Sequence, residues 1–168
     1  MSELDIRALA AAVPAHSSGP EVMSIRTERA FQLVDLTDGL RASVASTGLG
    51  AGALHLFCPH TSAGLAITEM EDGLHADFEA VLEELASRQR PWAHDDHTRR
   101  WQNIEHDGRL NGWSHIQGLL ATLPMLVLPI VGGTLGLGAW QRVFFVELDG
   151  PRDRRSVTVQ AWGSPPAA

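Results

Sequence analysis

The sequence predicts a single α+β domain in which antiparallel β-sheets form a sandwich with two or three helices. Its length of 168 residues suits one domain. The 44% share of hydrophobic residues beside 20% charged residues is typical of a globular chain. The expected strands follow one another in adjacent pairs rather than alternating with helices, which favours antiparallel sheets. We therefore expect an N-terminal arm over 1–20, the folded domain over 21–163 and a disordered tail over 164–168.

The arm itself has a weak helical pattern. A short helix is expected after Ser2 and before Pro14, carrying the apolar side chains of Leu4, Ile6, Leu9 and Val13. The alternative is an arm that is loosely docked or disordered, as chain termini often are.

A β-hairpin and a capped helix are expected to open the domain. Strands over 22–27 and 30–36 are separated by a short polar turn, which predicts that they pair as a hairpin. Thr37 is then expected to cap a helix that ends at Gly48 or Gly50.

Two buried strands and a long amphipathic helix are expected next. The apolar run 52–58 and the segment 63–68 are typical of buried strands. The helix begins after Asp72, where Thr68 and Glu71 have the spacing of a capping box. Its inward stripe follows helical periodicity and consists of Leu74, Phe78, Val81, Leu82 and Leu85.

The second half is expected to hold a polar loop, one more helix and the remaining strands. Residues 88–109 are rich in His, Asp and Arg and lack periodicity, which favours a functional loop. A helix over 111–120 is expected to turn Ile116, Leu119 and Leu120 inward. Strands are expected over 125–130, 134–137, 140–148 and 156–162, with Gly132 and Gly133 in the turn between the first two.

Charge and cysteine content argue against several classes of function. The formal net charge of -7 disfavours bulk binding to nucleic acid or an anionic membrane. Cys58 is the only cysteine, so one chain can form neither a disulfide nor a cysteine-based zinc cage. No apolar run reaches the length of a membrane span, and the N-terminus lacks the basic region of a secretory signal. We expect a cytoplasmic protein whose partners include neither nucleic acid nor a membrane.

The polar turn between the two buried strands is the first candidate site. It contains His60, Thr61 and Ser62. An imidazole, two hydroxyls and the exposed amides of a turn can cradle an anion or a substrate. The alternative is a turn whose hydroxyls bind their own backbone. Cys58 beside it fits a buried core thiol better than a nucleophile.

A stretch rich in histidine and aspartate is the second candidate site. It holds His94, Asp95, Asp96, His97, His106, Asp107 and His115. Neutral imidazoles and carboxylates suit a divalent ion such as zinc, iron or manganese. The spacing matches no compact motif such as HExxH, and the alternative is a charged surface loop. His115 lies at the edge of a helical apolar stripe, so we expect its ring to face a pocket.

Three features near the C-terminus complete the candidates. Gln141 enters an expected buried strand and would need a hydrogen-bond partner there. Glu147 follows a strongly apolar run, so we expect an arginine or a metal beside it. The arginines of the stretch 152–155 either lie in a solvated turn or bind phosphate.

Taken together, these segments resemble one family, the YjbQ-like proteins (UPF0047), which are also called secondary thiamine-phosphate synthases. The similarity covers about residues 23–162 and consists of pieces in family order: His60-Thr61-Ser62-Ala63, Glu69 with Gly73, Trp92-Ala93-His94-Asp95-Asp96, Asn111-Gly112-Trp113-Ser114-His115-Ile116, Leu135-Gly136-Leu137-Gly138-Ala139-Trp140-Gln141-Arg142 and Glu147-Leu148-Asp149-Gly150-Pro151-Arg152. Two positions depart from the family pattern. Ala139 stands where the family has threonine, and Trp113 stands where some members have a second histidine.

The resemblance implies a compact α+β fold that assembles as a homotrimer with pockets near the subunit interfaces. It also implies an activity: joining a pyrimidine diphosphate to a thiazole phosphate to form thiamine phosphate, with release of pyrophosphate. The expected partner is therefore a small phosphorylated metabolite. The alternatives are a non-catalytic metal- or metabolite-binding protein and a metal-dependent hydrolase of a small ester.

We assign candidate roles on the basis of these motifs and the resemblance. The expected catalytic residues are His60, Thr61, Ser62, Glu69 and Gln141. The expected ligands of a divalent metal, zinc or magnesium, are His60, His94 and His115. The expected phosphate-binding residues are Thr61, Ser62, Arg142 and Arg155.

Overall fold

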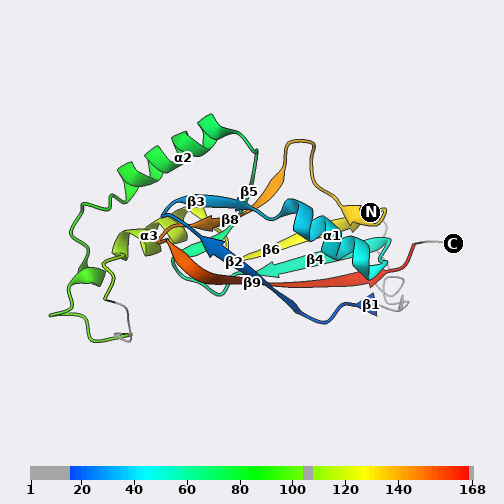
Figure 1. Ribbon diagram of the computed structural model, residues 1–168, viewed down its shortest axis with the longest axis horizontal. Coiled ribbons are helices and arrows are strands. Elements are labelled where there is room, and N and C mark those ends of the chain that lie inside the picture. Colours follow the sequence, from blue (N-terminus) through cyan, green and yellow to red (C-terminus); the bar gives the residue numbers. More distant parts are fainter. Residues whose placement is uncertain (1–15, 104–107, 167–168) are drawn as a thin grey trace, which may run out of the picture.

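The computed structural model describes residues 16–103 and 108–166. In these residues it has nine strands, three α-helices and one short 3-10 helix, and the strands form two antiparallel sheets (Figure 1). The α+β fold expected from the sequence is confirmed. The helix expected over 4–13 lies outside the described residues.

The larger sheet has the strand order β1-β9-β4-β6-β7, with β2 also paired to β9. Its strands are β1 (His16–Ser17), β2 (Glu21–Thr27), β4 (Ala51–Phe57), β6 (Met125–Val131), β7 (Thr134–Leu135) and β9 (Arg152–Ser164). Side chains alternate along β6, so Leu126, Leu128 and Ile130 are buried while their neighbours are exposed. The prediction that residues 164–168 are disordered is wrong for Ser164, because this residue belongs to β9 and pairs with Ala51 of β4.

The smaller sheet has the order β3-β8-β5, with β3 (Gln32–Asp35), β5 (Ala63–Thr68) and β8 (Arg142–Glu147). Its central strand β8 is buried on both faces. Val143 and Phe145 join the core that fills the space between the two sheets. Phe144 and Val146 belong to a second apolar cluster with Leu82 of the long helix. This double burial explains why β8 reads as a continuous apolar run.

The hairpin expected from β2 and β3 is wrong, because the two strands lie in different sheets. β2 pairs with β9, whereas β3 pairs with β8. Phe31 lies between them with a backbone φ of 50°, and its side chain is buried against Phe78 at a ring-centroid distance of 5.4 Å. Burial of this ring turns the chain from one sheet to the other.

Helix α1 (Thr37–Thr47) ends as expected at Gly48, which has a left-handed φ of 68°. The expected capping role of Thr37 is wrong. Thr37 is the first helical residue, and its buried hydroxyl accepts a hydrogen bond of 2.9 Å from the amide of Val143. The threonine therefore ties α1 to the smaller sheet.

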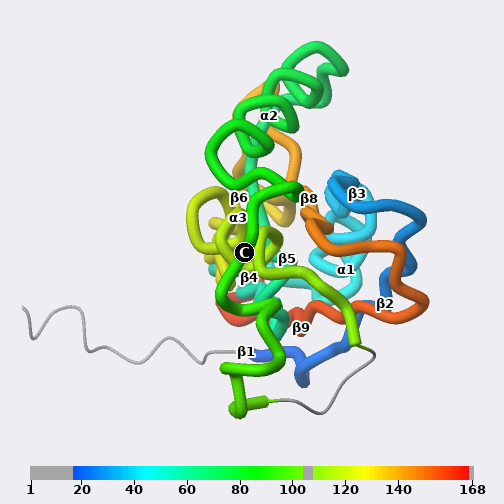
Figure 2. The backbone as a smooth tube through the Cα atoms, turned by 90° about the vertical axis from the view of Figure 1, so that its left-hand side faces the viewer, coloured from blue at the N-terminus to red at the C-terminus, as the bar shows by residue number. Residues whose placement is uncertain are grey.

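Helix α2 (Asp72–Leu85) stands apart from the larger sheet and covers the outer side of the smaller one (Figures 1 and 2). Glu71 caps it without Thr68, because its own carboxylate accepts hydrogen bonds from the amides of Gly73 and Leu74. The expected inward stripe is only partly right. Leu82 is buried and Phe78 is half-buried, whereas the remaining members are exposed: Leu74, Val81 and Leu85.

The inward stripe expected for helix α3 (Gly112–Ala121) is mostly wrong: Ile116 is half-buried, but the other two members are exposed. Leu119 is 83% exposed and Leu120 is 61% exposed. The buried residues are Gly112, Trp113, Ser114, Gln117 and Gly118. Small residues allow the helix backbone to approach its neighbours closely, and the Gln117 side-chain amide donates to the carbonyls of Leu82 and Ala86. In the described part of the chain, no helix is both long enough and apolar enough to cross a membrane.

Candidate functional site

The predicted site residues lie at opposite ends of the smaller sheet. Ala63 pairs with Glu147 at one end, and Thr68 pairs with Arg142 at the other. With a rise of about 3.4 Å per residue, the two ends are roughly 17 Å apart along β8. The first end carries the turn of His60, Thr61 and Ser62, and the second carries Glu69, Gln141 and Arg142.

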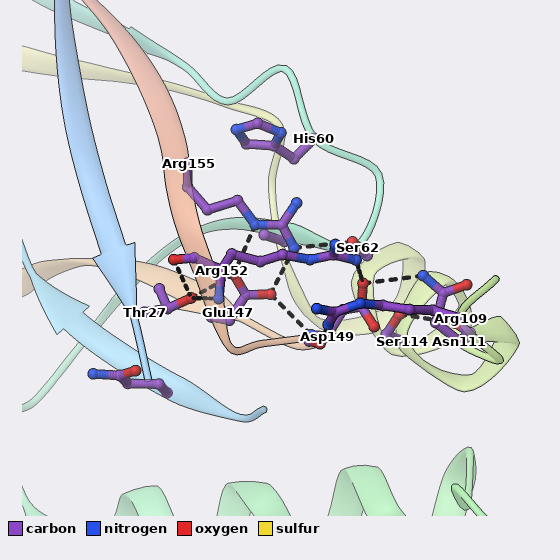
Figure 3. Close-up of polar contacts among 12 residues, drawn as sticks. Thr27, His60, Ser62, Arg109, Asn111, Ser114, Glu147, Asp149, Arg152 and Arg155 are labelled. Atoms are coloured by element: carbon purple, nitrogen blue, oxygen red, sulfur yellow. Dashed lines mark hydrogen bonds and ion pairs between the residues drawn. The ribbon is translucent and has the colours of Figure 1, made fainter. Parts of the chain in front are cut away.

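A buried ion pair joins the two sheets at the first end (Figure 3). Arg155 of β9 donates from Nε to Glu147 Oε2 at 2.7 Å and from Nη2 to Glu147 Oε1 at 2.6 Å. Burial alone would raise the pKa of Glu147, but hydrogen bonds from Arg155 and from the Asp149 amide lower it. Glu147 was expected beside an arginine or a metal, and the arginine is confirmed.

Further hydrogen bonds complete this ion pair. Arg155 Nη2 also donates to the Ser62 hydroxyl at 3.1 Å, which fixes the start of β5. The Thr27 hydroxyl donates to Glu147 Oε2 at 3.1 Å, and the Asp149 amide donates to Oε1 at 2.9 Å. Ser62 is therefore a buried structural partner of Arg155 rather than an exposed donor.

Two carboxylates anchor the start of α3. Asp149 accepts a hydrogen bond of 3.0 Å from the Asn111 side chain and pairs with Arg152. Asp95, in the 3-10 helix η2 (Ala93–Asp95), accepts from the backbone amides of Asn111 and Gly112 at 3.0 and 2.9 Å. These hydrogen bonds satisfy the backbone N–H groups at the start of the helix and hold α3 in place.

A cavity of about 380 Å³ lies between α3 and the His60–Ser62 turn. Its lining is mostly apolar, with two imidazoles and two hydroxyls, and consists of His60, Thr61, Ala63, His115, Gly118, Leu119, Thr122 and Pro124. His115 thus faces a pocket, as its place at the helix edge predicts. We call this space the His60–His115 cavity.

His60 is oriented by the larger sheet. Its Nε2 accepts a hydrogen bond of 2.9 Å from the backbone amide of Ser156, so the proton of the neutral ring lies on Nδ1. Burial lowers the pKa of His60, and the nearby Arg155 guanidinium lowers it further. The neutral ring therefore presents one N–H donor, at Nδ1.

His115 and His94 form a pair of rings whose centroids are 4.6 Å apart. Burial lowers the pKa of each ring. Arg100 Nη1 lies 2.9 Å from His94 Nε2 and also donates to the His94 carbonyl. A guanidinium in this position keeps His94 neutral, because a charged imidazolium would be repelled.

The expected three-histidine metal site does not fit this arrangement. Within residues 16–103 and 108–166, no three His, Cys, Asp or Glu side chains are grouped as ligands of one ion. His60 Nε2 is occupied by the Ser156 amide, and His94 Nε2 faces a guanidinium that repels a cation. His106 and Asp107 lie outside the described residues.

The other end of the smaller sheet holds a separate group. Arg142 forms ion pairs with Asp35 at 2.6 Å and with Asp38 at 3.4 Å, so its charge is balanced there. Gln141 is exposed rather than buried, and its side-chain oxygen accepts from the Gly138 amide at 2.8 Å. Glu69 is exposed as well. Within one chain, none of these three residues lines the His60–His115 cavity.

Sequence reasoning did not give Asp95, Asn111 or Asp149 a role in holding α3. The signal that could have found them is local. Asp95 lies within the polar loop 88–109, Asn111 follows that loop, and Asp149 lies in the turn after the buried strand. Their side chains bind backbone amides and one another across the fold, and the spacing of residues in the sequence does not predict such contacts.

The chain is similar to proteins of one family along most of its length. The family model described as UPF0047 protein YjbQ-like matches residues 21–164. A UPF0047 protein of Methanothermobacter thermautotrophicus is 32% identical over 143 residues, which cover 85% of this chain and 91% of that protein. The UPF0047 protein YugU of Bacillus subtilis is 28% identical over 134 residues, or 80% of this chain and 92% of the relative.

Solved structures show the same similarity. A YbjQ-like protein of unknown function from Sulfolobus solfataricus superposes with a TM-score of 0.77 at 30% identity, covering 89% of this chain and 99% of that one. A hypothetical protein from Aeropyrum pernix gives a TM-score of 0.74 at 31% identity, with 88% and 100% covered.

We predict that Glu147→Gln lowers the free energy of unfolding by about 3–5 kcal/mol, because it leaves the Arg155 guanidinium buried without a counter-charge. Urea denaturation at fixed protein concentration measures this, with exposed Glu84→Gln as the control. The Glu147 carboxylate stabilises the folded wild type at any pH above 4.5, the usual pKa of the group. This contribution is lost as the pH falls through the pKa of Glu147 in the folded protein, which is lower. Equal denaturation midpoints of the two variants at pH 7 would contradict the prediction.

Proposed function

The chain belongs to the UPF0047 protein YjbQ-like family, and we propose that it binds a small phosphorylated metabolite in the His60–His115 cavity. The observation that carries this proposal is a cavity of about 380 Å³ in which few polar groups face a mostly apolar wall. Such a lining suits a small organic body with one polar end.

The donors available to an anion come from the His60–Ser62 turn. His60 offers Nδ1–H, since its Nε2 is held by the Ser156 amide. Thr61 is exposed and offers a hydroxyl. Arg155 lies beside His60, and its hydrogen bonds to Glu147 and Ser62 use Nε and Nη2 but not Nη1 (Figure 3). His115, whose pKa burial lowers, takes up a proton when an anion enters the cavity, because the added negative charge raises that pKa.

We propose thiamine-phosphate formation as the reaction, on the strength of the family resemblance. The bond between the pyrimidine methylene and the diphosphate breaks, and the electron pair leaves with the diphosphate. The thiazole nitrogen then attacks the resulting carbocation, so no proton transfer is required. His60, Thr61 and protonated His115 would stabilise the departing diphosphate through hydrogen bonds and charge. No step is assigned to a metal, because the described histidines do not form a metal site.

One observation favours a second candidate, a metabolite-binding protein without turnover. Glu147 balances the charge of Arg155, and Asp149 pairs with Arg152. A dissociative reaction needs positive charge at the departing diphosphate, and these pairs reduce what the site can supply. Binding without catalysis needs less charge.

We predict that His115→Ala and Thr61→Val each weaken binding of inorganic pyrophosphate about tenfold, the loss expected for one hydrogen bond to a charged group. The free energy of unfolding should change by less than ~1 kcal/mol, because neither residue is in the packed core. Isothermal titration calorimetry and urea denaturation measure the two quantities, and exposed His97→Ala is the control. A large loss of stability with unchanged binding would make His115 a core histidine.

The reaction is tested by growth of a strain that lacks its own thiamine-phosphate synthase. We expect the wild-type chain to restore growth without thiamine and His115→Ala to fail at equal expression. Failure of the wild type, together with no turnover by purified protein, would overturn the reaction. Pyrophosphate binding measured on that same protein would then decide whether the binding function stands.

We also propose that three copies assemble, as the family resemblance implies. Apolar side chains exposed on α3 and on the outer face of β6 support this, and they include Leu119, Leu120, Met125, Val127 and Val131. Analytical ultracentrifugation should give three times the 18.2 kDa chain mass, and Val127→Glu should lower it. A monomer at micromolar concentration would refute the assembly.

A further inference from the structure

A second cavity lies between α2 and the turn that leads into β3. It has a volume of about 310 Å³ and shares no lining residue with the His60–His115 cavity. One wall is the first half of α2, and the other is the start of β3 with the turn before it. The lining residues are Asp72, His75, Ala76 and Glu79 on α2, and Arg29, Phe31, Gln32 and Leu33 opposite.

Three hydrogen-bond acceptors share the helical wall. Asp72, His75 and Glu79 are spaced i, i+3 and i+7, so they lie on one face of α2. The His75 Nε2 atom lies 2.8 Å from the Glu69 carbonyl, which can only accept, so Nε2 carries a proton. In the neutral ring Nδ1 is then an acceptor.

The two carboxylates of this wall differ in charge balance. Glu79 is paired with Arg29 at 3.5 Å and with Arg88 at 3.3 Å. The Asp72 carboxylate forms no hydrogen bond or ion pair with another residue in the described part of the chain. Glu79 lies two helical turns, about 10 Å, further along α2, and among the described residues the arginines pair with Glu79 and not with Asp72. The Asp72 end of the groove therefore carries an unpaired negative charge.

The groove also has an apolar surface, which we call its floor. It consists of Phe31 and Leu33 opposite α2 and of Ala76 on α2. Phe31 has a φ of 50°, which is unusual for a bulky residue, and packing against Phe78 holds it there. A fixed apolar floor beside an unpaired carboxylate is complementary to a cation that carries a hydrocarbon body.

We propose that this groove binds the ammonium group of a small organic amine, with Asp72 as its counter-ion and His75 Nδ1 as a second acceptor. The hydrocarbon part of the amine lies over Leu33 and Ala76. The chain contains no lysine, so no lysine side chain of this protein can supply the ammonium group.

The test is an NMR titration of the full chain with n-butylammonium, n-butanol and butyrate. We expect saturable binding of the ammonium alone, weakened about tenfold or more by Asp72→Asn. Asp72→Glu retains the charge and should retain binding. Asp77→Asn, which removes an exposed α2 carboxylate outside the groove, should leave it unchanged.

Three results would overturn the proposal: no saturation by n-butylammonium, equal binding of n-butanol, or an equal loss in Asp77→Asn. If Asp72→Asn fails to fold, binding by Asp72→Glu and the comparison of the three probes still test the proposal. An amidated N-acetyl-lysine probe separates two sources of the ammonium group. Tighter binding of that probe supports a lysine of a partner protein, and tighter binding of n-butylammonium supports a free amine.

Discussion

The ion pair between Glu147 and Arg155 is the interaction on which the rest of the site depends. It connects the last residue of β8 in the smaller sheet to β9 in the larger one. Burying two charges is costly unless each is paired and hydrogen-bonded. Here the Thr27 hydroxyl and the Asp149 amide complete the carboxylate, and Ser62 accepts from the guanidinium. The two sheets are therefore held together at the end where the cavity forms.

The same pair determines the electrostatics of the cavity. Because Glu147 balances Arg155, the guanidinium adds little net charge, yet it still helps to keep His60 neutral. Burial keeps His115 neutral as well. The cavity is thus a nearly uncharged space, and the anion binding that we propose depends on the uptake of a proton by an imidazole. Catalysis would require the imidazole to keep that proton while the diphosphate departs, whereas binding without turnover would not.

The sequence predicted most strands, because alternation and apolar runs follow directly from burial. The range of β5 was predicted without error, and β4 and β6 were within one residue. The faces of α2 and α3 were not predicted well, since apolar periodicity reports which residues are apolar and not what covers them. Leu119 and Leu120 are exposed, while Gln117 is buried because its amide binds the end of α2. A pattern of apolar residues does not predict a polar residue that is buried in a contact between helices.

The candidate site shows the same division between local and long-range information. The His60–Ser62 turn was found because its residues are neighbours in the sequence, and His115 because it lies at a helical edge. Within one chain, Arg142 does not lie with them. It begins strand β8 and Glu147 ends it, so the two residues lie at opposite ends of the smaller sheet. The separation is a matter of geometry rather than chemistry: residue type selects what can bind phosphate, but position along the strands decides which of those residues of one chain can meet around one ligand. In a single chain the register assigns Arg155 and His60 to one end, and Arg142 with its aspartates to the other.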